Sequence, residues 1–156
     1  MTAGTHGSTL PGMVQVHGTC VDVDGTAVLL LGPAGSGKSD LALRLIDGGA
    51  RLVADDRAEV RLRDGRLVVS APPETGGLME VRGVGVMRVD PAGEAPLGLV
   101  VDLVPADAVE RLPETAAWDC LGVSVPLLKL APLEASAPAK VRLAVRRVTG
   151  DIMPVP

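Results

Sequence analysis

The sequence predicts one α/β domain with a mixed, β-rich core built around a phosphate-binding loop (P-loop). Short aliphatic or alternating segments recur along the 156 residues, and two pairs of them are joined by Asp-Gly turns, which are typical of β-hairpins. A glycine-rich loop at residues 32–37 separates an aliphatic segment from an amphipathic one. Hydrophobic residues make up 47% of the chain, which is enough for one globular core.

The first part of the chain is expected to be rich in strands. Residues 1–13, which are rich in Gly and Thr, are expected to be a disordered N-terminus. Residues 14–23 then form a strand that turns at Asp24-Gly25 into the aliphatic strand 27–31. After the glycine-rich loop, apolar side chains at helical spacing predict a helix over residues 39–47. Its inner face consists of Leu41, Ala42, Leu45 and Ile46.

The domain is expected to span residues 14–150, followed by a tail at 151–156. After residue 50 it alternates strands with loops. The predicted strands cover residues 51–54, 58–63, 66–70, 97–104 and 122–130, with a glycine-interrupted segment at 79–88 and no clear pattern at 105–119. The last predicted element is a helix over residues 139–148. Its inward side chains are Val141, Ala144, Val145 and Val148, and its outward ones are Arg142, Arg146 and Arg147.

The composition argues against several classes of function. The chain has no Phe, no Tyr and one Trp, so side chains that stack on bases are almost absent, and its net charge of −4 disfavours nucleic acid and anionic membranes as partners. Cys20 and Cys120 lie 100 residues apart, with no CxxC motif and no His nearby at ligand spacing, which predicts two packed, reduced thiols rather than a zinc site. We therefore expect a cytoplasmic protein without a membrane span.

The strongest functional signal is a match to G-x-x-x-x-G-K-[ST] at every fixed position, formed by Gly32, Pro33, Ala34, Gly35, Ser36, Gly37, Lys38 and Ser39. Glycines allow backbone N–H groups to turn toward phosphate oxygens, and the following helix adds the positive end of its dipole. Lys38 is expected to contact the β and γ phosphates of a nucleotide, and the Ser39 hydroxyl to bind Mg²⁺. The alternative is a glycine-rich turn that ends in a serine cap.

Four further side chains could take part in chemistry. Asp55 and Asp56 follow a short strand, where one carboxylate could organise Mg²⁺ and the other accept a proton, or both could cap a turn. Glu80 is a charged residue in an apolar segment, which is costly unless it faces a metal, a partner or water, as an exposed strand position would. His17 lies on the opening strand and is either catalytic or structural.

Together, and in this order, these residues resemble the catalytic domain of the HPr kinase/phosphorylase family, bacterial enzymes that phosphorylate a serine of the phosphocarrier protein HPr. The resemblance rests on Val16-His17-Gly18, Gly37-Lys38-Ser39, the segment RLVADD at residues 51–56 and the segment EVRGVG at residues 80–85. The last two segments are far more specific than the glycine-rich loop, which many families share. The resemblance covers most of the chain.

The resemblance implies a fold similar to that of phosphoenolpyruvate carboxykinase, with ATP on residues 32–39. It implies that Asp56 is the base for the acceptor serine and the acid in the reverse reaction, and that Glu80 joins Ser39 at Mg²⁺. His17 and Lys38 are implied to be catalytic as well. If Asp56 is the base, Asp55 is left as the carboxylate of the pair that could organise the metal. An HPr-like phosphocarrier is the implied partner, and the family commonly forms hexamers, so a homo-oligomer is expected.

The chain departs from the family pattern in several places. Thirteen residues precede the first predicted strand, so we expect a short form without the family's N-terminal domain. Asp40 follows the glycine-rich loop where Glu is common, and residues 90–96 stand where the family has a longer loop. No Arg occurs from Leu112 to Val141, although the family's C-terminal Pro-rich loop supplies an active-site arginine. Lys129 or Lys140 could replace it only as a point charge.

The leading hypothesis is therefore an ATP- and Mg²⁺-dependent serine kinase for HPr or an HPr-like carrier, which regulates metabolism linked to the phosphotransferase system. Phosphorolysis, the reverse activity of the family, is not assumed. One alternative is a kinase or NTPase for another acceptor, which the shortened loop favours. Another is a nucleotide-binding regulatory module with little catalysis, which the missing arginine favours.

Overall fold

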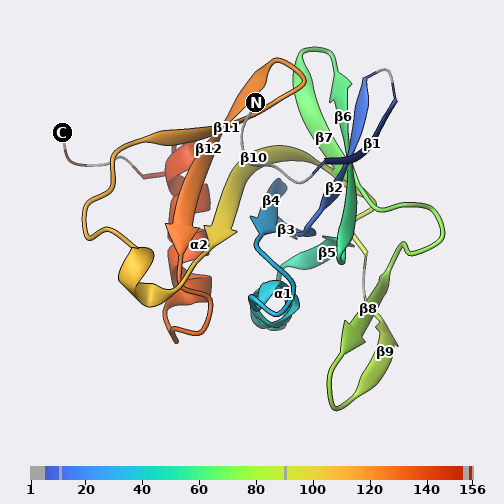
Figure 1. Cartoon of the computed structure of the whole chain (residues 1–156), viewed down its shortest axis with the longest axis horizontal. Coiled ribbons are helices and arrows are strands. Elements are labelled where there is room, and N and C mark those ends of the chain that lie inside the picture. The colour runs from blue at the N-terminus through green and yellow to red at the C-terminus, as the bar shows by residue number, and fades with distance from the viewer. Residues whose placement is uncertain (1–5, 11, 90, 153–154, 156) are drawn as a thin grey trace.

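The computed structural model describes residues 6–10, 12–89, 91–152 and 155. Figure 1 shows strands that form a large bent sheet, two helices against one part of it, and a small hairpin that projects from the domain. The elements in chain order are β1 (His6–Leu10), β2 (Met13–His17), β3 (Thr19–Val23), β4 (Thr26–Leu31), α1 (Lys38–Asp47), β5 (Arg51–Ala54), β6 (Arg57–Arg63), β7 (Arg66–Ser70), β8 (Leu78–Val81), β9 (Gly85–Arg88), β10 (Glu94–Leu103), the 3₁₀ turn Ala106–Ala108, β11 (Ala116–Cys120), β12 (Val123–Leu130) and α2 (Ala137–Val148).

One long strand joins two parts of the large sheet. The strand order is β1-β2-β6-β7-β10-β4-β3-β5, and β12 pairs with β10 and with β11. The first residues of β10, Glu94 to Pro96, pair antiparallel with β7, whereas its later residues run parallel to β4 and β12. The projecting hairpin, β8 and β9, forms a separate two-stranded sheet. The fold is thus mixed and β-rich, as the sequence predicts.

The central strands are buried on both faces. In β4, the residues Ala27, Val28, Leu29 and Leu30 are all fully buried, and alternate side chains belong to different hydrophobic clusters because successive residues of a strand point to opposite faces. The helices α1 and α2 cover one face, and side chains of β2, β6 and β7 belong to the cluster on the other. Because β4 is covered on both faces, its sequence is a continuous aliphatic run rather than an alternation of apolar and polar residues.

Both Asp-Gly hairpin turns are confirmed. The φ values are 50° and 93° at Asp24 and Gly25, and 53° and 77° at Asp64 and Gly65. Two successive residues with positive φ form the turn that matches the twist of paired antiparallel strands, and Asp followed by Gly tolerates it well. The predicted helix and strands that flank the glycine-rich loop, and the strand before the aspartate pair, are also confirmed within one residue.

Two predictions about the N-terminal region were wrong. Residues 6–10, expected to be disordered, form the edge strand β1, which pairs antiparallel with β2. Residues 14–23 form two strands rather than one, because β2 pairs with β6 while β3 pairs with β4 and β5. The chain changes partners at Gly18, whose N–H donates a hydrogen bond to the carbonyl oxygen of Asp56 at 3.0 Å. The alternating pattern does not reveal this break because it continues through both strands.

The C-terminal half differs from the prediction in smaller ways. The region without a clear pattern, 105–119, contains a 3₁₀ turn and most of β11. Helix α2 begins two residues earlier than predicted, with a proline in its first turn, where a missing N–H costs nothing. Val141 and Val145 are buried as expected, but Val148, the last residue of the helix, is exposed. Cys20 and Cys120 are buried free thiols, as predicted. Within the described ranges, no helix is both long and apolar enough to span a membrane.

Candidate active site

Three segments of the chain meet at one edge of the sheet. β4 leads into the glycine-rich loop, and β5 leads into Asp55-Asp56. β3 lies between β4 and β5 and runs antiparallel to both, so its first residue, Thr19, lies at the edge where those two strands end. The topology therefore brings together the glycine-rich loop, the aspartate pair and the segment His17-Gly18-Thr19.

The glycine-rich loop forms a cradle at the start of α1. Gly35 and Gly37 have φ values of 81° and 101°, a left-handed conformation that favours glycine, and Gly37 is the N-cap of the helix. Lys38 is buried, with 7% of its surface exposed. Its Nζ donates hydrogen bonds to the carbonyl oxygens of Gly32 at 2.8 Å and Pro33 at 3.1 Å, which places the ammonium group inside the loop.

The interior of this loop is polar and sterically restricted. Among the side chains that the structure describes, Ser36 has a buried Oγ with no hydrogen-bond partner, and a Cβ built on Gly32 would lie 2.5 Å from that atom. The N-terminal N–H groups of a helix lack intrahelical acceptors and favour an anion. An orphaned hydroxyl, an ammonium group and a helix N-terminus in one loop fit the binding of phosphate oxygens.

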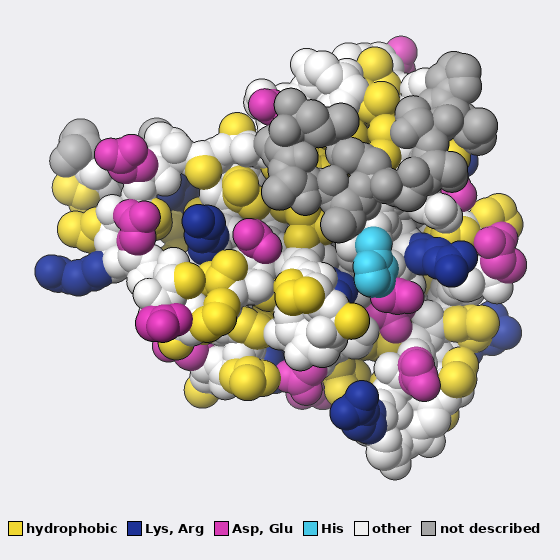
Figure 2. All heavy atoms as spheres, viewed as in Figure 1, with side chains coloured by type: hydrophobic (Ala, Val, Ile, Leu, Met, Phe, Trp, Pro, Cys, Tyr) yellow, Lys and Arg dark blue, Asp and Glu magenta, His cyan; other side chains and the backbone are white. Residues whose placement is uncertain are grey.

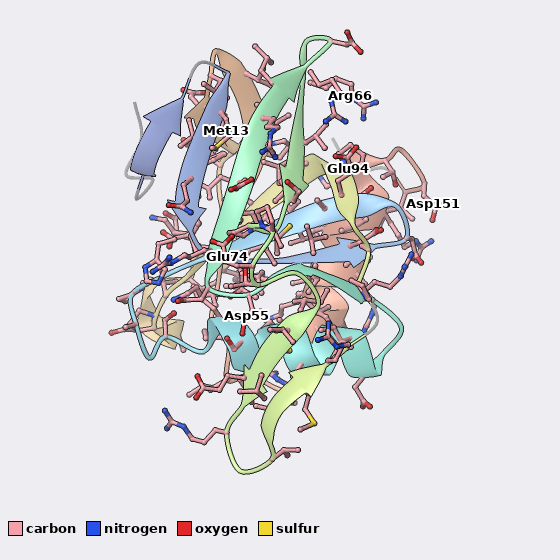
Figure 3. All side chains as sticks on the ribbon, turned by 90° about the vertical axis from the view of Figure 1, so that its right-hand side faces the viewer. Met13, Asp55, Arg66, Glu74, Glu94 and Asp151 are labelled. Atoms are coloured by element: carbon pink, nitrogen blue, oxygen red, sulfur yellow. The ribbon has the colours of Figure 1, made fainter. Side chains whose placement is uncertain are left out.

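Asp55 is held beside the glycine-rich loop. Its Oδ1 accepts hydrogen bonds from Ser39 Oγ at 2.8 Å and from Thr19 Oγ1 at 3.1 Å. Figure 3 shows Asp55 next to α1, with the β8–β9 hairpin projecting below it. The Ser39–Asp55 contact joins the first turn of α1 to the end of β5, so the predicted metal ligand and one predicted carboxylate lie together.

Asp56 faces the solvent rather than the core. Its Oδ1 lies 2.6 Å from His17 Nε2, and the two side chains are 68% and 48% exposed respectively. Asp56 has a φ of 68°, a left-handed conformation that Asp tolerates better than most residues. The backbone is fixed there because Asp56 N–H donates to Thr19 Oγ1 at 3.2 Å. On the face drawn in Figure 2, a histidine side chain lies beside acidic ones.

A cleft of about 920 Å³ separates the glycine-rich loop from the projecting hairpin. The loop side contributes Lys38 and Ser39, and Asp56 also lines the cleft. The hairpin side contributes residues 79–86, among them the exposed Glu80 and Arg82. Glu80 therefore faces water in the same cleft as Ser39, although Glu80 lies on β8 and Ser39 in the first turn of α1. In the described part of the chain, no group of three or more His, Cys, Asp and Glu side chains is arranged to hold a metal ion.

The loop that follows β12 lies against the glycine-rich loop. A Cβ on Gly37 would lie 3.3 Å from Pro132, and the Arg44 guanidinium donates to the carbonyl oxygens of Pro132 and of Glu134, the latter at 3.2 Å. Each of the two lysines considered as a substitute for the missing arginine has an acidic neighbour. Lys140 Nζ lies 3.3 Å from Glu134 Oε1. Lys129 stands opposite Asp102 in the β10–β12 register, and its charge opposes the rise in the pKa of Asp102 that burial causes.

The sequence analysis missed two residues of this site. Thr19 is fully buried at the junction of the three segments, and the only signal for it is a hydroxyl at the start of a mostly apolar strand. Arg44, on the outer side of α1, ties the helix to the loop after β12. Its position four residues after Asp40 predicts only a salt bridge along the helix, which the structure also contains.

A glycine-rich loop at a helix N-terminus, with an aspartate pair beside it at the edge of a cleft, is typical of nucleotide-binding proteins that transfer phosphoryl groups. Residues 8–141 match the family model described as the HPr Serine kinase C-terminal domain. The chain therefore belongs to that family.

Individual relatives agree with this assignment. The chain is 38% identical over 125 residues to the HPr kinase/phosphorylase of Caldanaerobacter subterraneus subsp. tengcongensis, covering 78% of this chain and 40% of the relative. It is 36% identical over 123 residues to HPr kinase/phosphorylase 1 of Oceanobacillus iheyensis, covering 74% and 38%. The solved structure of the Hpr(Ser) kinase/phosphatase from Coxiella burnetii superposes with a TM-score of 0.77 at 25% identity, covering 88% of this chain and 91% of that one. The chain spans 25% to 40% of the length of the curated relatives it matches.

Proposed function

We propose that this chain is an ATP- and Mg²⁺-dependent kinase that transfers a phosphoryl group to a serine of HPr or of an HPr-like phosphocarrier. The observation that carries the proposal is the direct connection between the glycine-rich loop and the aspartate pair, made by Ser39 Oγ and Asp55 Oδ1 at 2.8 Å. The names of the relatives supply the acceptor. A role in regulating metabolism linked to the phosphotransferase system follows from that acceptor.

In this proposal residues 32–39 act as a P-loop for the phosphates of ATP. Lys38, inside the loop, would neutralise the β and γ phosphates, and Ser39 with Glu80 would hold Mg²⁺. Mg²⁺ in such sites takes one or two protein carboxylates and completes its shell with phosphate oxygens and water, so a larger cluster of acidic side chains is not required. The bound metal and nucleotide supply charge neutralisation and the transferable phosphoryl group.

The two aspartates have different surroundings, which supports different roles. Asp55 is tied to the loop through Ser39, where it would orient the metal and its waters. Asp56 lines the cleft, where it would accept the proton of the acceptor hydroxyl as general base. His17 Nε2, 2.6 Å from Asp56 Oδ1, would orient that carboxylate so that its second oxygen faces the acceptor. Positioning of this kind, together with charge neutralisation, provides most of the rate in phosphoryl transfer.

The reverse reaction, phosphorolysis, is not part of the proposal. Among the residues that line the cleft, the cations are Lys38 and Arg82, and the loop after β12 contributes no arginine. A lysine neutralises a phosphoryl group as a point charge and does not hold two of its oxygens at once. Phosphorolysis brings a second anion, free phosphate, into the same cleft. We therefore expect it to need the cations of the cleft more strongly than forward transfer does.

Further expectations depend on the family likeness. These are a fold related to phosphoenolpyruvate carboxykinase, a cytoplasmic location and assembly into a homo-oligomer. The aliphatic strand β12 is partly covered within the chain itself, because Leu127 and Leu128 pack against the two hydrophobic clusters. If an oligomer forms, we expect the contact to use another surface.

The experiment that tests the proposal is incubation of the purified chain with γ-labelled ATP, Mg²⁺ and the HPr-type proteins of its own organism. Label on a serine of the carrier supports the proposal. ATP turnover without labelled carrier indicates a kinase or NTPase for another acceptor. Nucleotide binding without turnover indicates a regulatory module, and either of these two outcomes rejects HPr as the substrate.

A further inference from the structure

Thr19 contacts both aspartates of the site, although it is not among the residues that line the cleft. Thr19 is fully buried, and its Oγ1 makes hydrogen bonds to the two consecutive residues that follow β5. Thr19 Oγ1 donates to Asp55 Oδ1 at 3.1 Å and accepts from Asp56 N–H at 3.2 Å. A hydroxyl is suited to this place because it donates and accepts at once.

Both bonds act on groups that the proposed reaction uses. Asp55 Oδ1 also accepts from Ser39 Oγ at 2.8 Å, so two hydroxyls, one from β3 and one from α1, fix the orientation of this carboxylate. The bond to Asp56 N–H holds a residue whose φ of 68° is unfavourable without support. Gly18 N–H and His17 Nε2 complete the contacts to Asp56, at its carbonyl oxygen and its carboxylate.

We infer that Thr19 is a positioning residue that sets the place of the metal-side carboxylate, Asp55, relative to the base, Asp56. The inference rests on the proposed function, in which Asp55 orients the metal and Asp56 is the base. Removing one hydroxyl would release Asp55 to be held by Ser39 alone and would leave the Asp56 N–H without its acceptor. Asp55 and a metal ion would then compete for the Ser39 hydroxyl, and no second hydroxyl would hold the carboxylate in place.

The test compares Thr19→Val, which keeps the shape of the side chain and removes the hydroxyl, with Thr19→Ser, which keeps the hydroxyl. Thr149→Val is the matched control, since Thr149 Oγ1 bonds only carbonyl oxygens at the end of α2. The first readout is Mn²⁺ binding to the chain saturated with ADP, measured by electron paramagnetic resonance. The second is the kcat and KM of phosphoryl transfer, and thermal unfolding is followed for each variant.

We expect Thr19→Val to weaken Mn²⁺ binding by about 10- to 100-fold, the usual effect of removing a group that orients a metal-site residue. We also expect kcat to fall while the KM for the acceptor stays unchanged, and Thr19→Ser and Thr149→Val to behave as the wild type. Wild-type Mn²⁺ binding and kcat in Thr19→Val would overturn the inference. Equal losses in Thr19→Ser would overturn it as well, because they would show that packing and not the hydroxyl matters. Mn²⁺ binding needs no acceptor, so it tests Thr19 even if HPr is not the substrate.

Discussion

Asp56→Asn separates the chemistry of the site from its stability. The substitution keeps the backbone conformation, since Asn tolerates a φ of 68° as well as Asp does, and it keeps the backbone bonds to Gly18 and Thr19. The contact that changes is with His17, between side chains that are 68% and 48% exposed. An exposed pair contributes about 0.2–1 kcal/mol, and about 1 kcal/mol lowers the melting temperature of a domain of this size by about 2–4 °C. We expect a decrease of no more than about 4 °C.

The effect on the reaction is expected to be much larger. Loss of a general base lowers the rate by about 10² to 10⁴, which corresponds to about 2.7 to 5.4 kcal/mol in the activation barrier. The assay is single-turnover transfer of labelled phosphate to the carrier, with nucleotide affinity measured in parallel and expected to be unchanged. Asp64→Asn is the matched control, because Asp64 is an exposed residue in a hairpin turn with a φ of 53°. A wild-type transfer rate in Asp56→Asn would refute the assignment and move the base to another side chain, with Glu80 and His17 the next candidates.

Three further predictions follow from contacts at the site and in the core. Lys38→Ala removes the buried ammonium group of the loop and is expected to abolish transfer; full activity would reject the P-loop assignment. Ser39→Ala deletes a hydroxyl that contacts Asp55 and is expected to raise the Mg²⁺ concentration needed for half-maximal turnover, and an unchanged Mg²⁺ titration would count against its role. Burial raises the pKa of the Cys20 thiol, so alkylation at mildly alkaline pH is expected only after unfolding, and rapid labelling of the native chain would contradict the buried position.

The elements around the glycine-rich loop could be predicted because local chemistry determines them. An aliphatic run, a loop with glycines at positive φ and an amphipathic segment each leave a sequence pattern, as do the Asp-Gly turns. The change of partner at Gly18 could not be predicted in this way. It depends on which strands lie beside β2 and β3, and that pairing brings together residues 17–19 and 55–56, which are far apart in the chain.

The site shows the same division. Lys38 and Ser39 could be named from the glycine-rich loop, and the aspartate pair from its place after a short strand. Their distinct surroundings could not, because Asp55 meets Ser39 and Asp56 meets His17 only once β3 lies between β4 and β5. Thr19 was missed for the same reason, since the partners of its hydroxyl are 36 and 37 residues away in the chain.

The most direct test of the central claim is the mass and linkage of the carrier after incubation with the purified chain, ATP and Mg²⁺. The account predicts HPr that carries one added phosphoryl group on a serine, in an acid-stable ester, and unmodified HPr when Lys38→Ala replaces the wild type. Unmodified HPr with the wild-type chain, or a phosphoryl group in an acid-labile linkage to histidine, would contradict it.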